Sequence, residues 1–255
     1  MEFEGRVSVI TGAAMGIGAA TVEAFVGEGA RVLALDLNPV VGELAERFSA
    51  KVISRVCNVA DGREVAAAFE QAEASFGAID FLVNNAGIQR YGTVTETSEA
   101  LWEEVMNVNL KSAFLCAQQA LPLMQKKGHG VIINVGSVQS FLSQQRVAAY
   151  TTSKSALLGL TRSIAVDYAP HIRCLAVCPG TVDTPMLRWA IAQSPDPEKV
   201  LQECMDMHPL KRIAQPKEIA EMILYLCGDR AAFMTGQYVR VDGGLGITIP
   251  GSQRD

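Results

Sequence analysis

The chain has 255 residues, of which 49% are hydrophobic and 19% are charged, a composition typical of a globular domain rather than a disordered or fibrous protein. The formal net charge of −5 comes without a basic stripe, which makes nucleic acid a poor partner on electrostatic grounds. No apolar run is long enough to predict a transmembrane helix, and the amino terminus has no secretory signal pattern, so we expect a cytoplasmic protein with no membrane association.

Runs of apolar and β-branched residues alternate along the chain with segments of helical periodicity. In chain order we predict a strand over 6–11, a helix over 17–28, strands over 31–36 and 52–58, a helix over 61–76, a strand over 79–84, a helix over 102–124, a strand over 131–137, a helix over 150–168, a strand over 172–178, a helix over 216–227 and a strand over 237–241. This alternation predicts an α/β fold, namely a single-domain, Rossmann-type, doubly wound parallel sheet with helices on both faces. Because neither a linker nor a repeat divides the chain, we predict one domain over 1–255.

The segment 184–210 departs from the alternation, because it lies between a strand and the next clear helix and contains several prolines. An insertion of this length is more often functional than not. Two interpretations stay open, a helical hairpin on the surface and a mobile lid over an active site, and we favour the lid.

The cysteines of the chain are Cys57, Cys116, Cys174, Cys178, Cys204 and Cys227. In a protein that is not exported, thiols stay reduced. Cys174 and Cys178 are close enough in sequence to suggest zinc, but no second close pair of Cys or His completes a tetrahedral site. We therefore predict buried free thiols and no metal site.

A glycine-rich turn joins the first predicted strand to the first helix. It has the pattern G-x-x-x-G-x-G and contains Gly12, Met15, Gly16, Ile17 and Gly18. Glycines let the main chain approach a pyrophosphate closely, and the helix amino terminus supplies unpaired N–H groups and the positive end of the helix dipole. These residues are our candidates for binding the pyrophosphate of a dinucleotide cofactor.

Asp36 closes the second predicted strand and bears on the choice of dinucleotide. An acidic residue there accepts hydrogen bonds from the ribose hydroxyls of the adenosine half and repels the 2′-phosphate of NADP. Ala13, Ala14 and Leu37 offer no cation that would hold this phosphate. We therefore predict NAD rather than NADP, and an NAD-binding catalytic domain.

Tyr150 and Lys154 share one face at the start of a predicted helix. A free tyrosine has a pKa near ~10, which is too high for a base at neutral pH, but a nearby ammonium group favours the phenolate. Ser137 ends the fifth predicted strand, at the sheet edge where ligands bind, and can donate a hydrogen bond to a substrate oxygen. The three side chains are candidates for general acid/base catalysis.

These motifs together resemble those of the short-chain dehydrogenase/reductases, along nearly the whole chain. The matching residues are Thr11-Gly12, Gly16, Gly18, Asn84 to Gly87, Asn109, Ser137, Tyr150, Lys154 and Pro179-Gly180. The resemblance implies that Tyr150 is the general acid/base, that Lys154 binds the nicotinamide ribose and tunes Tyr150, and that Ser137 orients the substrate oxygen. It further implies that Asn109 holds a water molecule that links Lys154 to solvent.

The resemblance also implies which residues line the cofactor groove. They are Asn85, Ala86, Gly87, Pro179, Gly180, Val182 and Thr184, with Val182 and Thr184 at the nicotinamide carboxamide. One departure is visible, because the family usually has Asp-Val after the third strand and this chain has Asn58 and Val59. Asn still offers an acceptor oxygen to the adenine amino group, so we expect binding to survive.

Polar side chains predominate at the positions that we expect around the substrate. The candidates are Gln89, Gln139, Arg146 and Trp189. Amide and guanidinium groups suit a polyhydroxylated ligand, although the alternative that several of them point to solvent stays open. The stretch from 150 to 185 and the tail at 245–255 look like the aldohexose (sugar) dehydrogenases of the family, which suggests a sugar substrate. The family also suggests a homotetramer.

Two other functions stay open. A 3-oxoacyl or other keto or hydroxysteroid reductase would usually prefer NADPH, and Asp36 opposes it. A non-catalytic NAD-binding regulator could have the same fold. The presence of Asn109, Ser137, Tyr150 and Lys154 together argues against the regulator, which has no chemical need for all four.

Overall fold

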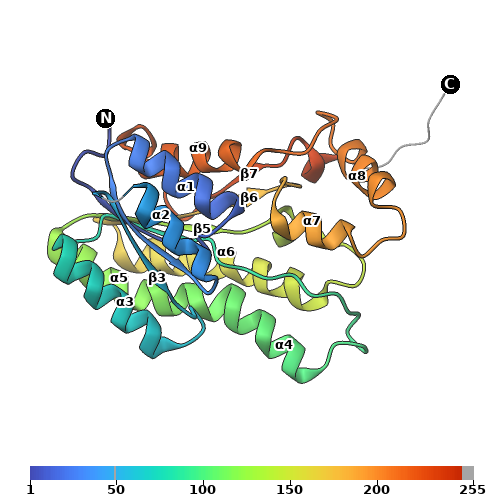
Figure 1. Cartoon of the computed structure of the whole chain (residues 1–255), viewed down its shortest axis with the longest axis horizontal. Coiled ribbons are helices and arrows are strands. Elements are labelled where there is room, and N and C mark those ends of the chain that lie inside the picture. The colour runs from blue at the N-terminus through green and yellow to red at the C-terminus, as the bar shows by residue number, and fades with distance from the viewer. Residues whose placement is uncertain (49, 249–255) are drawn as a thin grey trace.

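Within residues 1–48 and 50–248, which the computed structural model describes, parallel strands form one seven-stranded sheet in the order β3-β2-β1-β4-β5-β6-β7 (Figure 1). The strands are β1 (Val7–Thr11), β2 (Arg31–Asp36), β3 (Val52–Val56), β4 (Phe81–Asn84), β5 (Gly130–Val135), β6 (Ile172–Pro179) and β7 (Tyr238–Val241). The predicted doubly wound parallel sheet is confirmed, and each predicted strand is present. The strand order reverses between β1 and β4, which is where ligands of such sheets bind.

Helices cover both faces of the sheet (Figure 1). They are α1 (Gly16–Gly27), α2 (Gly42–Arg47), α3 (Gly62–Phe76), α4 (Glu99–Met106), α5 (Ser112–Lys127), α6 (Ala148–Tyr168), α7 (Pro185–Ile191), α8 (Pro197–Asp206) and α9 (Pro216–Cys227). Phe25 of α1 and Ile223 of α9 belong to one buried cluster with Val83 of β4. Phe69 of α3 belongs to a second cluster, with Leu82 of β4. Adjacent residues of one strand thus face different helix layers, which is why the strands are continuously apolar.

The helix predicted over 102–124 is longer than expected and contains an irregular turn. It runs over 99–127, and its middle segment, Asn107–Lys111, is a π-helix between α4 and α5. The hydroxyl oxygen of Ser98 accepts a hydrogen bond from the main-chain N of Leu101 and caps the amino terminus. π-helical turns inside helices occur often at functional sites, and this one contains Asn109.

The segment 184–210 contains the helices α7 and α8. Thr184 caps α7 by accepting a hydrogen bond from Leu187 N, and Asp196 caps α8 by accepting one from Lys199 N. The segment therefore forms a pair of short surface helices (Figure 1). Two further elements that the sequence did not predict, α2 and the 3-10 turn Pro39–Val41, follow β2. Of the tail at 245–255, residues 249–255 lie outside the described residues.

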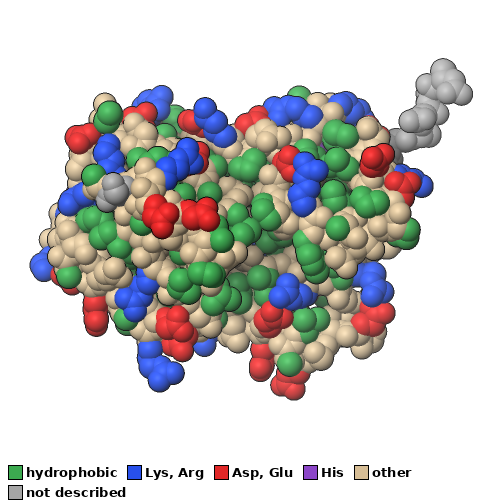
Figure 2. Space-filling model, viewed as in Figure 1, with side chains coloured by type: hydrophobic (Ala, Val, Ile, Leu, Met, Phe, Trp, Pro, Cys, Tyr) green, Lys and Arg blue, Asp and Glu red, His purple; other side chains and the backbone are tan. Residues whose placement is uncertain are grey.

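Among the described residues, no helix is long and apolar enough to cross a membrane. Figure 2 shows positive and negative side chains interspersed on the face that it draws, with hydrophobic side chains between them. This distribution agrees with the absence of a basic stripe from the sequence.

Asp80 ties the beginning of β4 to its neighbours in the sheet. Its fully buried carboxylate accepts hydrogen bonds from Arg6 Nη1 at 2.8 Å, Lys127 Nζ at 2.7 Å and the main-chain N of Val7 at 2.9 Å. Burial by itself would raise the pKa of Asp80, but the hydrogen bonds from Lys127, Arg6 and Val7 outweigh it and hold the pKa below its usual value. The ionised group therefore stabilises the junction of β1, β4 and the end of α5.

We expect Asp80→Asn to lower the free energy of unfolding at pH 7 by about 3 kcal/mol, because two cations lose their buried partner. The Asp80 pKa is lower in the folded than in the unfolded chain, so its stabilisation is present above the unfolded pKa of about 3.9 and is lost as the pH falls through the lower folded value. Urea unfolding at pH 7 and at about pH 4 measures both effects, with the difference smaller at the lower pH. Glu73→Gln, in an exposed pair with Lys126, is the control and should change stability by less than about 1 kcal/mol. Equal stability of Asp80→Asn and the wild type at pH 7 would contradict the assignment.

Candidate active site

The glycine-rich turn after β1 is fixed to the loop after β4 by side-chain hydrogen bonds. Thr11 Oγ1 accepts from the main-chain N of both Asn85 and Ala86 at 3.0 Å. Asn85 Nδ2 in turn donates to the carbonyl oxygens of Thr11 and Gly12, each at 3.0 Å. The loops after β1 and β4 are thus held together at the point where the strand order reverses.

Two glycines of the turn stand where no side chain fits. Gly12 has φ +63°, and a Cβ atom there would lie 2.8 Å from Ala86 Cα. A Cβ atom on Gly18 would lie 1.9 Å from the carbonyl oxygen of Gly12. The first turn of α1 therefore packs directly against the loop, and its N-cap residue Met15 makes no side-chain hydrogen bond to the helix. The amino terminus of α1, where the predicted pyrophosphate contacts Gly16 and Ile17 lie, therefore has no side-chain cap.

Asp36 lies at the end of β2 and faces this turn. One carboxylate oxygen accepts from the main-chain N of Ala14 at 2.9 Å and the other from that of Asn38 at 2.8 Å. These bonds fix the orientation of the carboxylate beside the glycine-rich turn. Asp36 therefore bonds to the glycine-rich turn and places its carboxylate at the end of β2.

Asn58, at the family's usual Asp position, is used within its own loop. Its Oδ1 accepts from Ala60 N at 3.1 Å, and its main-chain N donates to Glu64 Oε2 at 2.8 Å. Val59 beside it is buried. The loop that follows β3 is therefore locally ordered by the Asn58 side chain.

Asn109 links the π-helical turn to the loop after β4. Its Oδ1 accepts from Ile88 N at 2.8 Å, and its Nδ2 donates to Ile88 O at 2.9 Å and to Ser153 Oγ at 3.0 Å. Ser153 Oγ donates onward to the carbonyl oxygen of Tyr150 at 2.7 Å. The side chain of Asn109 thus connects the loop at Gly87 and Ile88 to the beginning of α6.

Ser137, Tyr150 and Lys154 come together between the end of β5 and the first turns of α6. Lys154 is buried, its Nζ donates to the carbonyl oxygen of Val135 at 2.8 Å, and it lies 5.8 Å from the centroid of the Tyr150 ring. Gly87 faces the same group, since a Cβ atom there would lie 3.3 Å from Lys154 Nζ. Three of the predicted catalytic side chains therefore form one buried cluster, and Asn109 is joined to it through Ser153.

Burial governs the ionisation of this cluster. It raises the pKa of the Tyr150 phenol, an effect that interaction with the Ser137 hydroxyl partly offsets. It also lowers the pKa of the Lys154 ammonium from 10.5 to about 8. The pKa of Tyr150 is therefore raised in the protein alone, rather than lowered as its pairing with Lys154 predicts, because desolvation disfavours the phenolate.

The loop after β6 brings the remaining predicted cofactor residues to the same edge of the sheet. Pro179 ends β6, and Val182 pairs with Ala214 as an isolated β-bridge. Thr184 packs on the glycine-rich turn, because a Cβ atom on Gly16 would lie 3.2 Å from Thr184 Cγ2. The turns that follow β1 and β6 are therefore in contact beside the amino terminus of α1.

The predicted substrate residues have partners of their own. Gln139 Nε2 donates to Gln144 Oε1 at 3.2 Å, and Arg146 forms an exposed ion pair with Glu96 at 3.1 Å. Trp189 of α7 stacks on Tyr91, with ring centroids 6.5 Å apart and planes 17° apart. Gln89 is half-buried in the loop after β4, where its carbonyl oxygen accepts from Arg90.

Sequence patterns did not single out three polar residues that organise the site. Ser140 Oγ donates to the carbonyl oxygen of Lys154 at 2.8 Å, and Ser153 joins Asn109 to Tyr150. His208, between α8 and α9, accepts a hydrogen bond from the main chain of the loop after β6. For Ser153, its place one helical turn after Tyr150 was a usable signal, but the partners of Ser140 and His208 are distant in sequence.

The cysteines are free and, apart from the half-buried Cys204, buried. Cys174 and Cys178 both lie in β6, four residues apart, and burial raises the pKa of both thiols. In the part of the chain that the structure describes, no group of three or more His, Cys, Asp or Glu side chains could hold a metal ion.

Comparison with known proteins connects this geometry to a family. Residues 12–246 match the family described as enoyl-(acyl carrier protein) reductase. The chain is 40% identical to a 3-oxoacyl-[acyl-carrier-protein] reductase of Thermotoga maritima, covering 97% of this chain and 100% of that protein. It is also 40% identical to a 2-(R)-hydroxypropyl-CoM dehydrogenase of Xanthobacter autotrophicus, covering 93% and 97%.

The solved structure of ligand-free aldohexose dehydrogenase of Thermoplasma acidophilum superposes with a TM-score of 0.93. The two chains are 39% identical, and the match covers 99% of this chain and 98% of that one. The superposition over nearly the full length shows that the two chains share the fold. The chain therefore belongs to the short-chain dehydrogenase/reductase family, whose members are oxidoreductases that use a nicotinamide cofactor.

Proposed function

We propose that the protein is an NAD-dependent dehydrogenase that transfers hydride between a secondary alcohol or its carbonyl form and nicotinamide, with an aldose as the substrate. The observation that carries the proposal is the buried cluster of Ser137, Tyr150 and Lys154 beside the glycine-rich turn. Burying an ammonium group next to a phenol is unfavourable, because both groups are desolvated. Groups whose pKa values burial displaces in this way cluster at functional sites.

The residues around the β1 turn fit a dinucleotide. Gly12 and Gly18 let the main chain of the turn pack closely on the loop after β4, and the α1 amino terminus has no side-chain cap, so its free N–H groups would be available to a pyrophosphate. The fixed carboxylate of Asp36 would accept hydrogen bonds from the adenosine ribose and repel a 2′-phosphate, which favours NAD. Asn85, Ala86 and Gly87 would form the opposite wall, and Val182 and Thr184 would contact the carboxamide.

When bound, the cofactor supplies a hydride acceptor or donor at its nicotinamide ring. In alcohol oxidation, the proton of the substrate hydroxyl group moves to the phenolate oxygen of Tyr150 as the C–H bond breaks. Ser137 would hold the same substrate oxygen, and the Lys154 ammonium would stabilise the phenolate and bind the nicotinamide ribose. In the reverse direction the phenol returns the proton to the carbonyl oxygen.

Proton exchange with solvent would pass the π-helical turn. Both amide hydrogens of Asn109 are donated, to Ile88 O and Ser153 Oγ. These bonds fix the side chain of Asn109 in the turn, where, as the resemblance to the family implies, Asn109 would hold a water molecule that links Lys154 to solvent.

Support for a sugar comes from the polar groups at the crevice and from the aldohexose dehydrogenase that superposes on this chain. Gln139 and Gln144 offer amide groups beside Ser137, and Gln89 lies in the loop after β4. Trp189 on α7 would close the crevice by its contact with Tyr91, which makes the segment 184–210 a lid.

Two further proposals concern assembly and the alternative substrate. Exposed apolar side chains on α4, α5 and α6, namely Trp102, Phe114 and Val166, would be covered in a homotetramer.

A 3-oxoacyl reductase is the second candidate, because a relative with that name is 40% identical to this chain. The position of Asp36 disfavours it, since such reductases usually take NADPH.

The decisive experiment is turnover of NAD and NADP with aldoses, aliphatic alcohols and hydroxysteroids, and of NADH and NADPH with a 3-oxoacyl thioester. We expect NAD-dependent oxidation of one or a few aldoses. Tyr150→Phe should lower kcat at least about 100-fold, because it removes the proton acceptor, while NADH binding measured by fluorescence stays within about twofold. Full activity of Tyr150→Phe would refute the mechanism, and reduction of the thioester with NADPH alone would favour the second candidate.

The choice of NAD is tested at Leu37, which is 68% exposed and directly follows Asp36. Leu37→Arg should lower the KM for NADP by about tenfold, because a guanidinium group can pair with the 2′-phosphate. Leu37→Gln is the matched control without charge and should leave the KM for NADP nearly unchanged. If both variants use NADP no better than the wild type, the adenosine ribose does not lie beside Asp36.

The buried ammonium group has a cost in stability that depends on pH. The Lys154 pKa is about 8 in the folded protein, against the ordinary lysine value of 10.5 that applies to the unfolded chain, so the unfolded chain binds more protons between these values. The destabilisation is complete below about pH 8 and disappears as the pH rises toward 10.5. Lys154→Met should therefore raise the free energy of unfolding at pH 7 by up to about 3 kcal/mol, with a smaller gain at high pH, while turnover is lost.

Denaturant unfolding at pH 7 and near pH 10 measures this difference. Lys126→Met is the control, because that lysine is largely exposed and its replacement should change stability little at either pH. A loss of stability in Lys154→Met at neutral pH, or a gain that is the same at both pH values, would contradict the cost of burial.

A further inference from the structure

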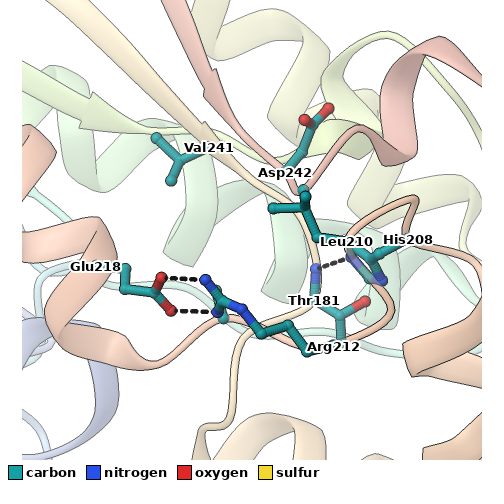
Figure 3. A pocket seen from close by; sticks show the side chains of 9 residues that line it. Thr181, His208, Leu210, Arg212, Glu218, Val241 and Asp242 are labelled. Atoms are coloured by element: carbon teal, nitrogen blue, oxygen red, sulfur yellow. Dashed lines mark hydrogen bonds and ion pairs between the residues drawn. The ribbon is translucent and has the colours of Figure 1, made fainter.

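His208 is a buried histidine that the proposed mechanism does not use. It lies two residues after the end of α8, and only 2% of its surface is exposed. Nδ1 lies 2.7 Å from the carbonyl oxygen of Cys204 in α8, and Nε2 lies 3.2 Å from the main-chain N of Thr181 in the loop after β6 (Figure 3). The imidazole ring thus joins α8 to the loop that holds the predicted nicotinamide contacts.

The two partners determine the tautomer of the ring. A carbonyl oxygen only accepts hydrogen bonds, so Nδ1 has to carry the hydrogen that is donated to Cys204. A main-chain N–H group only donates, so Nε2 has to offer its lone pair to Thr181. Both contacts are satisfied by one species, the neutral ring with its hydrogen on Nδ1. The bond to Cys204 also caps a carbonyl group in the last turn of α8, where carbonyls lack helical partners.

The surrounding main chain leaves space for this ring only because it contains glycine. A Cβ atom on Gly180 would lie 2.9 Å from His208 Nε2, and one on Gly243 would lie 3.2 Å from His208 Cδ2. The ring is therefore packed between the turn after β6 and the turn after β7, as well as being bonded to α8. Figure 3 shows His208 with Thr181 and Asp242 at the wall of a small pocket.

The segment that His208 holds continues to the cofactor turn. Thr181 O accepts from the main-chain N of Ala214 at 2.9 Å, and Asp183 N donates to Ala214 O at 2.9 Å. Thr184, at the far end, packs against Gly16 and caps α7. One end of the loop 180–184 is thus fixed by His208, and the other end contacts the glycine-rich turn and the first helix of the segment 184–210.

We propose that His208 is a positioning residue that holds the loop 180–184, through its Nε2 bond to Thr181, in the conformation that receives the nicotinamide half of the cofactor. The inference rests on the proposed function for the part that concerns the cofactor. Loss of the acceptor would free the Thr181 amide and let the loop leave the crevice. Because the same ring is bonded to α8, the position of the loop and the end of α8 are linked.

Two variants separate hydrogen bonding from packing. His208→Phe keeps a flat ring of similar size but loses the acceptor, and His208→Gln keeps an oxygen that can accept from Thr181 N at the place of Nε2. We expect roughly tenfold weaker NADH binding and a raised KM for the dinucleotide in His208→Phe, with recovery to within about threefold of the wild type in His208→Gln. Binding is measured by fluorescence titration, with thermal unfolding to establish that each variant is folded.

Hydrogen exchange of the cofactor-free protein gives a readout that does not depend on turnover. Peptides that span 180–184 should exchange faster in His208→Phe than in the wild type and at nearly the wild-type rate in His208→Gln. If His208 acted by packing alone, the exchange rates would rank in the opposite order, with His208→Phe close to the wild type. That ranking would overturn the proposal.

The wild-type protein provides a test that requires no variant to fold. Nitrogen-15 NMR of histidine side chains should show His208 as the tautomer with its hydrogen on Nδ1, and a hydrogen on Nε2 would overturn the proposal. If the wild type binds no NADH, the proposed function fails, whereas the exchange and NMR measurements still decide whether His208 holds the loop.

Discussion

The parallel pairing of β1 with β4 is the constraint on which the site depends. In a parallel sheet every strand ends at the same edge, and at this pair the chain leaves for helices on opposite faces, which opens a crevice between the two loops. The hydrogen bonds between Thr11 and Asn85 fix the floor of that crevice. At the opposite end of β4, the buried Asp80 carboxylate holds the strand with Arg6 and Lys127. The loop at the crevice is thus attached to a strand that is anchored at both ends.

The proposed catalytic cluster buries two groups that are better solvated in water. Lys154 and Tyr150 are both buried. Burial favours the neutral form of each, because it lowers the pKa of Lys154 and raises that of Tyr150. The hydrogen-bonded frame of Ser140, Ser153 and Asn109 keeps them in place by bonding their main chain and the adjoining loop. Such a site is unfavourable for stability, and burial brings the pKa of Lys154 closer to neutral pH while it moves the pKa of Tyr150 further away. The π-helical turn at Asn109 is part of the same frame.

The outer wall of the crevice is made by a different kind of structure. The loop 180–184 and the helices α7 and α8 are held by caps, a β-bridge and the ring of His208, with few buried apolar side chains in the two helices. Segments with little apolar burial are the ones that open most readily. In the proposed function, the region around α7 and α8 would therefore be the part that opens to admit a ligand, whereas the strands and the first turn of α1 belong to the packed core.

The sequence by itself determined the α/β class, the seven strands and the residue types of the cofactor turn and the catalytic cluster. These features have local signals, because apolar runs mark buried strands, glycines mark close approaches of the main chain, and Tyr150 and Lys154 are one helical turn apart. Only the tertiary structure decided what depends on partners distant in sequence. Arg146 pairs with Glu96, burial raises the pKa of Tyr150, and His208 reaches Thr181. The physical reason is that hydrogen bonding and desolvation depend on which groups the fold places within a few ångströms of one another. The separation of two residues along the sequence does not give that distance.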